Sequence, residues 1–283
     1  GLDAVTAIRM ATLNAAECFD LKDRGAIAPG YRADVVLLDD LKDFHVNRVF
    51  IQGALVAEEG KYLPEIKRYD ISTVKGSVIV KDFSAEKFKM HLKSNKVNVI
   101  KILPGGVVTA KDTAEIQLDE NGEFVRNPEE DIVKVAVVER HQGTGNVACG
   151  FLKGYGIKAG AVALSIAHDS HNIIVVGVSD EEMEFAVNSL IAQEGGMVLV
   201  REGKVLESMP MPIAGLMSDQ SGEWVDEKLT AIHAKAYEEL GIAGDVEPVM
   251  TLCFMSLAVI PEVKLTDMGL FDVTTFSFIP VEA

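Results

Sequence analysis

The residues best suited to chemistry lie together in the segment AHDSHNI, residues 167–173. Two imidazoles and a carboxylate within four positions are ligands that zinc, manganese or iron accept. The segment separates two apolar runs, 161–167 and 173–178, each of strand length. In an extended strand His168 and His171 would point to opposite faces, so they can converge only if a turn lies between the two runs.

Three interpretations of this segment remain open. It is a metal site, or a polar turn in which Asp169 and Asn172 act as turn formers, or a contact to a substrate site elsewhere in the protein. In the third case His168, Asp169 and His171 form a lid, and either histidine could transfer a proton near neutral pH. Metal ligation is the least favoured of the three, and we expect no metal ligands in this chain.

A second polar segment, ERHQGTGN at 139–146, contains two glycines that flank Thr144. Such a loop can present backbone N–H groups to an anion. The phosphate-binding patterns GxxxxGK[ST] and GxGxxG are absent, so a phosphate site is not expected. We expect instead a hydrogen-bonded loop packed near 167–173.

The segment MPMPIAGLMSD, 209–219, mixes flexible thioethers with two prolines. Met211 and Met217 could form an adaptable apolar wall beside a planar base, with Asn172 as a third candidate for substrate binding. An ordinary loop that faces the core is favoured over this interpretation, because methionine often only fills gaps. His45, His91 and His233 are isolated and are expected to be surface or packing residues.

The elements that must position these residues are strands and helices in alternation. Continuous apolar runs at 161–167 and 173–178 predict strands that are covered on both faces, and 133–138 is another strand candidate. Strands are also predicted at 77–82, 97–103 and 107–118, and a short helix at 84–94. Ser179 and Glu182 form a capping-box pattern before a helix with an apolar stripe. A hairpin around Glu202-Gly203 and a helix over 225–240 follow.

This pattern predicts an α/β (α+β) layered domain with a mixed sheet. Residues 1–63 differ from it, because they predict one helix and a small β-strand meander without a core of its own. We therefore expect two regions, 1–63 and 64–283. The absence of an initial Met, and a helical pattern that begins at Leu2, suggest the C-terminal part of a longer protein.

Composition excludes several function classes. The chain has 27 Lys and Arg against 43 Asp and Glu, a net charge of −16, which opposes binding to nucleic acid or anionic membranes. No apolar run reaches the roughly 18 residues of a membrane span. Three dispersed cysteines without a CxxC pair favour a reduced, cytoplasmic location. The cytidine-deaminase zinc signature with PCxxC is absent.

Two sets of motifs resemble known families. GAIAPGYRADVVLLD with NRVFIQGALVAEEGKY resembles the closing β-sandwich segment of amidohydrolase-superfamily enzymes. ERHQGTGN, the segment around AHDSHNI, PMPIAGLMS and VIPEVKLTDMGLFDV resemble the C-terminal domain of bacterial amidohydrolase-type adenine deaminases. This second resemblance covers roughly residues 130–275.

The resemblance implies hydrolysis of adenine to hypoxanthine and ammonia, for purine salvage, by an enzyme with manganese or iron. The metal-bound water would supply hydroxide for attack on C6 of the purine. The metal ligands of such enzymes lie on barrel strands that would precede Gly1, so this chain alone is expected to be inactive. Two alternatives remain: a different amidohydrolase, or a non-catalytic domain that supports a homo-oligomer.

Overall fold

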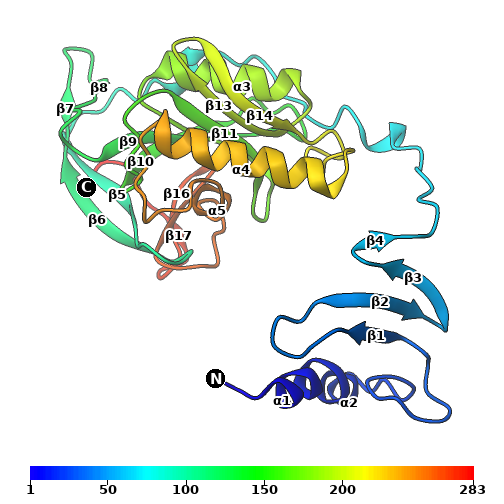
Figure 1. The fold of residues 1–283 in the computed structure, drawn as a ribbon. Coiled ribbons are helices and arrows are strands. Elements are labelled where there is room, and N and C mark those ends of the chain that lie inside the picture. The colour runs from blue at the N-terminus through cyan, green and yellow to red at the C-terminus, as the bar shows by residue number, and fades with distance from the viewer. The chain divides into compact units, whose positions relative to one another are not determined.

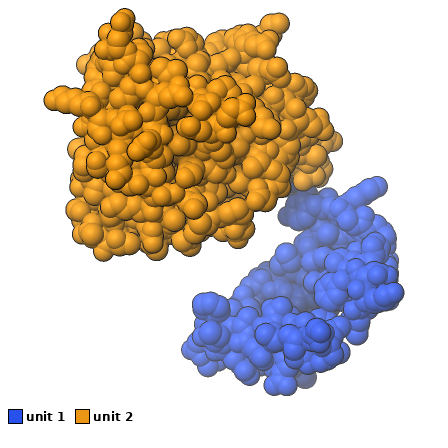
Figure 2. All heavy atoms as spheres, turned by 90° about the vertical axis from the view of Figure 1, so that its left-hand side faces the viewer, with its two compact units in different colours: residues 1–69 blue, residues 70–283 orange.

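The computed structural model describes residues 1–283, which divide into two compact units, Gly1–Tyr69 (unit 1) and Asp70–Ala283 (unit 2) (Figure 2). The division lies a few residues beyond the position 63/64 that the sequence suggests. Every residue of the segment 64–69 before it is exposed to solvent. None of the helices is both long and apolar enough to span a membrane.

Unit 1 is a helical segment followed by an antiparallel meander. Asp3 caps the first helix by accepting a hydrogen bond from the Thr6 N–H at 3.1 Å. Ala16 is the only buried residue of the unit, and Phe19 and Ile27 are 76% and 89% exposed. Unit 1 therefore has no core of its own. Its elements are α1 (Ala4–Arg9), a π-helical turn (Met10–Asn14), α2 (Ala15–Cys18), β1 (Val35–Leu38), β2 (Val46–Ile51), β3 (Ala54–Glu58) and β4 (Lys61–Tyr62).

Unit 2 is built on an eight-stranded mixed sheet with strand order β14-β13-β11-β12-β9-β10-β5-β6. Its neighbours are antiparallel except for β5 and β10, which run parallel. The strands are β5 (Lys96–Ile102), β6 (Thr109–Glu115), β9 (Ile132–Val138), β10 (Val147–Lys153), β11 (Ala161–Ala167), β12 (Asn172–Gly177), β13 (Gly196–Arg201) and β14 (Lys204–Pro210).

Helices cover both faces of this sheet (Figure 1). Val135 and Val137 of β9 pack in the cluster that includes α4 (Gly222–Glu238) and α5 (Pro248–Cys253). Ala136 and Val138 point to the opposite face and pack with α3 (Asp180–Ala192). This burial on both faces explains the unbroken apolar runs, and it confirms the predicted layered α/β class. A small sheet of β15 (Val263–Thr266), β16 (Gly269–Asp272) and β17 (Ser277–Phe278) and a pair β7 (Gln117–Leu118) and β8 (Phe124–Val125) complete unit 2.

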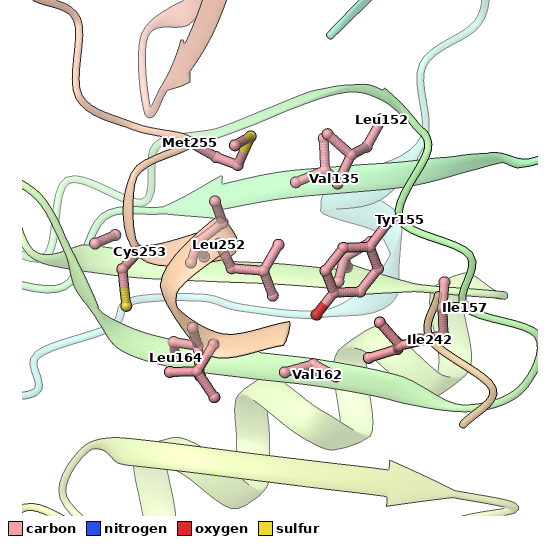
Figure 3. Close-up of a cluster of buried hydrophobic side chains, with 14 of the residues drawn as sticks. Val135, Leu152, Tyr155, Ile157, Val162, Leu164, Ile242, Leu252, Cys253 and Met255 are labelled. Carbon is pink, nitrogen blue, oxygen red and sulfur yellow. The ribbon is translucent and has the colours of Figure 1, made fainter. Parts of the chain in front are cut away.

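The helix α5 supplies the centre of the larger core cluster. Figure 3 shows Leu252 of α5 among side chains that include Tyr155 and Leu164. The Tyr155 hydroxyl is fully buried and donates to the Pro248 carbonyl at 2.8 Å, at the start of α5. This hydrogen bond gives the buried hydroxyl a partner within a mostly apolar layer.

Two local predictions about α3 and the following hairpin can be compared with the structure. Ser179 accepts a hydrogen bond from the Glu182 N–H at 3.3 Å, as a helix cap should. In a full capping box the Glu182 carboxylate would accept from the Ser179 N–H. That part of the prediction is wrong, because the carboxylate accepts from the Glu202 N–H at 2.5 Å instead. The hairpin is confirmed, with Glu202 and Gly203 at φ values of 53° and 68°, the left-handed pair that a two-residue turn requires.

Three other element predictions are wrong in part. Residues 77–82 form no strand; their backbone is bonded to the end of β9 only from the Ile79 N–H to the Arg140 carbonyl, and Val78 and Val80 pack against the core. The helix predicted over 84–94 is only a 3₁₀ turn, Ala85–Phe88, because Phe88, Met90 and Leu92 alternate with polar residues at the strand period. The strand predicted over 107–118 is interrupted between β6 and β7.

Candidate functional site

The two histidines at 168 and 171 do converge, because residues 168–171 form a turn, the histidine turn, between β11 and β12. Ala167 and Asn172 pair across its base, and the His171 N–H donates to the Ala167 carbonyl at 2.6 Å. The two imidazole centroids lie 5.3 Å apart, edge to face, and His168 also lies 4.8 Å from Phe254. The His168 N–H is fixed by the Cys253 carbonyl at 2.8 Å. Asp169 is exposed at the tip.

His171 has an unusual environment for a histidine on a turn. Its Nδ1 is buried and has no hydrogen-bond partner. Burial first, and then the neighbouring His168 and Arg140, lower the pKa of His171 below its ordinary value. Its imidazole is therefore neutral at physiological pH and keeps one nitrogen free to accept a proton.

The loop 139–146 binds its own anion. The Glu139 carboxylate accepts from the backbone N–H groups of His141 at 2.5 Å, Gln142 at 2.8 Å and Thr144 at 3.0 Å. Burial would raise the pKa of Glu139, but these N–H donors outweigh it and hold the pKa below its ordinary value. The loop contacts the histidine turn, since His141 Nε2 lies 2.7 Å from the Ser170 carbonyl. The backbone N–H groups are thus used internally, which agrees with a hydrogen-bonded loop.

Asn172 anchors the end of the histidine turn. It is buried, and its Oδ1 accepts from the Arg140 N–H at 3.3 Å. Its Nδ2 donates to Asp267 Oδ1 at 3.2 Å, and the second oxygen of Asp267 accepts from Asn146 Nδ2 at 3.4 Å. Asp267 thereby joins the two polar segments from a third part of the chain.

The two methionine candidates lie in different environments. Met211 is buried in the larger core cluster, whereas Met217 is 59% exposed. Both belong to the segment 211–218, the methionine loop, which the sheet fixes: Ser165 of β11 donates its hydroxyl hydrogen to the Gly215 carbonyl at 2.5 Å. The isolated His45, His91 and His233 are not part of the turn, and a ring nitrogen of each lies within 2.9 Å of a carboxylate oxygen.

Sequence reasoning missed three residues of this cluster. Arg140, Asp267 and Phe254 all contact the histidine turn or its base. Arg140 follows a strand buried along its whole length, which is the one signal that could have predicted its burial. Nothing in the local sequence connects Asp267 or Phe254 with residues about 90 positions earlier.

The tip of the histidine turn, Asp169 and Ser170, is exposed to solvent, whereas Arg140 and Asn172 beneath it are buried. The histidine turn lines none of three cavities of about 260, 320 and 240 Å³ in unit 2. Cys149 and Cys253 are not reactive alternatives, because burial raises the pKa of each thiol to about 12. The chain therefore contains a layered α/β domain in which two neighbouring central strands, β11 and β12, are joined by a turn that brings His168 and His171 together.

Comparisons with known proteins identify the family. The sequence model of the adenine deaminase C-terminal domain matches residues 106–277, and that of the amidohydrolase family matches residues 1–56. The chain belongs to the adenine deaminase C-terminal domain family.

Several curated relatives match over the whole chain. Adenine deaminase 2 of Desulfotalea psychrophila is 66% identical over 283 residues. The match covers 100% of this chain and 49% of that protein. The adenine deaminase of Ligilactobacillus salivarius is 49% identical over 282 residues, again with 49% of that protein covered. Adenine deaminase 2 of Carboxydothermus hydrogenoformans is 48% identical over 281 residues, with 49% covered. The chain thus spans about half the length of the curated relatives it matches.

The residues of this chain do not fit a divalent metal. No group of three or more His, Cys, Asp or Glu side chains is placed to hold one ion. His168 and His171 face each other, but His168 lies against Phe254, and the only carboxylate in the turn, Asp169, is exposed at its tip. Two imidazoles without a third protein ligand fall short of an ordinary structural or catalytic site.

Proposed function

We propose that this chain forms the C-terminal half of a metal-dependent enzyme that hydrolyses adenine to hypoxanthine and ammonia. The observation that carries this proposal is the pair of matches in one chain, an amidohydrolase match at 1–56 followed by an adenine deaminase C-terminal domain match at 106–277. Residues 1–63 would complete the catalytic domain, and residues 64–283 would form the C-terminal domain.

The finer parts of the proposal concern the setting of the enzyme. The metal would be manganese or iron, held by residues outside this chain. The enzyme would act in purine salvage in the cytoplasm as a homo-oligomer. The net charge of −16 supports a small-molecule substrate rather than a nucleic acid.

Within this chain, we propose that His168, Asp169 and His171 contact the substrate site of the full-length enzyme as a lid. Loss of ammonia from C6 requires that the departing amine be protonated, and a neutral imidazole with a free nitrogen can relay that proton. His171 would do so through Nε2, because its Nδ1 is buried away from the surface. Met217 would offer an apolar surface to the planar purine, and the buried Asn172 and Met211 would support this contact from beneath.

The test compares single substitutions in the full-length enzyme. His168→Ala and His171→Ala are expected to lower adenine turnover and to leave the bound metal, measured by elemental analysis, unchanged. His233→Ala is the matched control, because His233 lies on α4, with its Nε2 2.5 Å from the Glu247 carboxylate, and is not part of the turn. Loss of metal in either turn variant would instead show that the turn ligates it.

A second measurement uses the 283-residue chain itself. This chain is expected to release no hypoxanthine from adenine, because it has no three-residue ligand group. Measurable hypoxanthine would overturn the assignment of the reaction to the other half of the enzyme.

A further inference from the structure

Arg140 is a fully buried guanidinium that has no carboxylate partner. Its side chain is 1% exposed, and burial lowers the pKa of the guanidinium from its ordinary value, although it stays charged. The adjacent Glu139 carboxylate is turned into its own loop. A buried charge is costly unless it is paired or hydrogen-bonded, so the bonds that Arg140 makes must compensate for its burial.

Backbone carbonyls replace the missing carboxylate. Arg140 Nε donates to the His171 carbonyl at 2.5 Å, Nη2 donates to the Ala214 carbonyl at 3.2 Å, and Nη1 lies 3.4 Å from the Ser77 carbonyl. Each carbonyl belongs to a different segment: the histidine turn, the methionine loop and the segment 74–79. One planar fork of donors therefore fixes three loops at once.

The backbone of Arg140 adds two further bonds to the same segments. Its N–H donates to Asn172 Oδ1 at 3.3 Å, directly after the histidine turn. Its carbonyl accepts from the Ile79 N–H at 2.8 Å. The 74–79 segment is in turn bonded to the methionine loop, because the Ala214 N–H donates to the Val74 carbonyl at 2.8 Å. Arg140 is thus the common partner of these three segments.

The methionine loop is shaped around the guanidinium. Gly215 has a φ of 71°, and a Cβ atom on it would lie 2.8 Å from Arg140 Nη1 and 3.0 Å from Cζ. No side chain fits between the loop and the guanidinium, so the planar group lies directly against the Gly215 backbone. A lysine has the charge but neither this flat shape nor the fork of donors.

We propose that Arg140 is the positioning residue that holds the histidine turn, and with it His168 and His171, in the orientation used for turnover. The inference rests on the proposed function of that turn. Arg140 itself touches no substrate. It acts through the His171 carbonyl and through Asn172, and it couples the orientation of the turn to that of the methionine loop.

The test uses Arg140→Lys, which keeps the charge and removes the fork. In the 283-residue chain, the imidazole NMR signals of His168 and His171 are expected to shift relative to wild type. In the full-length enzyme, kcat is expected to fall on the order of 10- to 100-fold, while KM changes by less than about twofold, because small displacements of a reacting group have such effects. Arg126→Lys is the matched control, since Arg126 also donates to a backbone carbonyl, that of Ile157, away from the turn.

A second variant covers the case in which Arg140→Lys does not fold. Gly215→Ala leaves Arg140 in place but displaces its guanidinium, and it should produce the same shifts and the same fall in kcat. Unchanged histidine signals in a folded variant would overturn the positioning role. Shifted signals with an unchanged kcat would show that the turn has no part in turnover, and would also overturn it.

The two arms separate this inference from the proposed function. If the full-length protein does not deaminate adenine, the proposed function fails. The NMR arm then still decides whether Arg140 sets the orientation of the two histidines.

Discussion

Two buried lysines in unit 2 have opposite electrostatic surroundings. Lys134 donates to Asp180 at 2.7 Å and to the Phe88 carbonyl at 2.9 Å. Lys264 is fully buried, but its Nζ has one partner, the Val107 carbonyl at 3.0 Å, and no carboxylate. Burial lowers the pKa of Lys264 to about 8. Lys134, paired with Asp180, therefore stabilises the fold, whereas Lys264, a buried charge with no carboxylate partner, lowers its stability.

Lys264→Met should increase the free energy of unfolding at pH 7, by a few kcal/mol at most, because the charged form of Lys264 is penalised in the folded state. The folded pKa lies below the unfolded value of 10.5, so the unfolded chain binds more protons between about pH 8 and 10.5. Wild-type stability therefore gains from this group as pH rises through that window. Denaturant titrations of both proteins at pH 7 and pH 10 should show a smaller difference at pH 10, and a constant difference would contradict the argument.

Lys134→Met is expected to act in the opposite direction. It removes the nearer of the two ammonium groups beside the largely buried Asp180, leaving Lys89 at 3.9 Å, and should cost up to about 3–5 kcal/mol. The same denaturant titrations measure it. A neutral or stabilising effect would show that Asp180 finds another partner.

Glu139→Gln should destabilise unit 2 by about 1–3 kcal/mol at pH 7, since a charged acceptor of several N–H groups is replaced by an amide. The pKa of Glu139 is lowered in the folded state, so its contribution is complete above the unfolded value of 4.5 and is lost as pH falls below it. The difference between wild type and variant should therefore shrink in thermal unfolding at acidic pH.

At the scale of elements, the strands that are buried on both faces are the most predictable part of the fold. The runs at β11 and β12 are long and almost wholly apolar, and β9 is interrupted only by Lys134. The segment after Ser84 was not predictable in the same way, because its few apolar residues are separated by polar ones. Hydrophobic periodicity cannot distinguish a helix from an extended segment where a short stretch fits both the 3.6-residue and the 2-residue period.

The N-cap of α3 provides a test at this scale. Ser179→Ala removes the acceptor for the Glu182 N–H and should destabilise unit 2 by about 0.5–2 kcal/mol. Ser221→Ala, at the corresponding position of the more exposed α4, is the comparison. Since α3 packs under three central strands, its cap should have the larger effect on thermal unfolding, and equal effects would argue against this.

The candidate site was predictable in composition but not in geometry. The sequence places His168 and His171 between two strands, yet their approach to 5.3 Å depends on the shape of one turn. Arg140 and Asp267 reach the turn only through tertiary packing, which no local spacing encodes. The sequence predicted that the loop 139–146 is hydrogen-bonded. It did not predict that the Glu139 carboxylate would accept those bonds.

At the scale of the whole molecule, the two units differ in what can stabilise them. Nearly all buried apolar residues belong to unit 2, and unit 1 contributes only Ala16. Residues 70–283 expressed alone should therefore unfold cooperatively and give a dispersed amide NMR spectrum. Residues 1–69 alone should give neither, because they bury too little apolar surface to offset the entropy of folding. A cooperative transition in the 1–69 peptide would contradict this.

The exposed segment 64–69 has a practical consequence for handling the chain. A protease needs several residues of accessible, extended backbone, and every residue of this segment, including Lys67 and Arg68, offers its surface to solvent. Brief digestion with trypsin should remove the residues up to this segment and leave a resistant product that begins shortly after Arg68. The start of the resistant product would thus mark the border between the part of the chain that carries its own core and the part that does not.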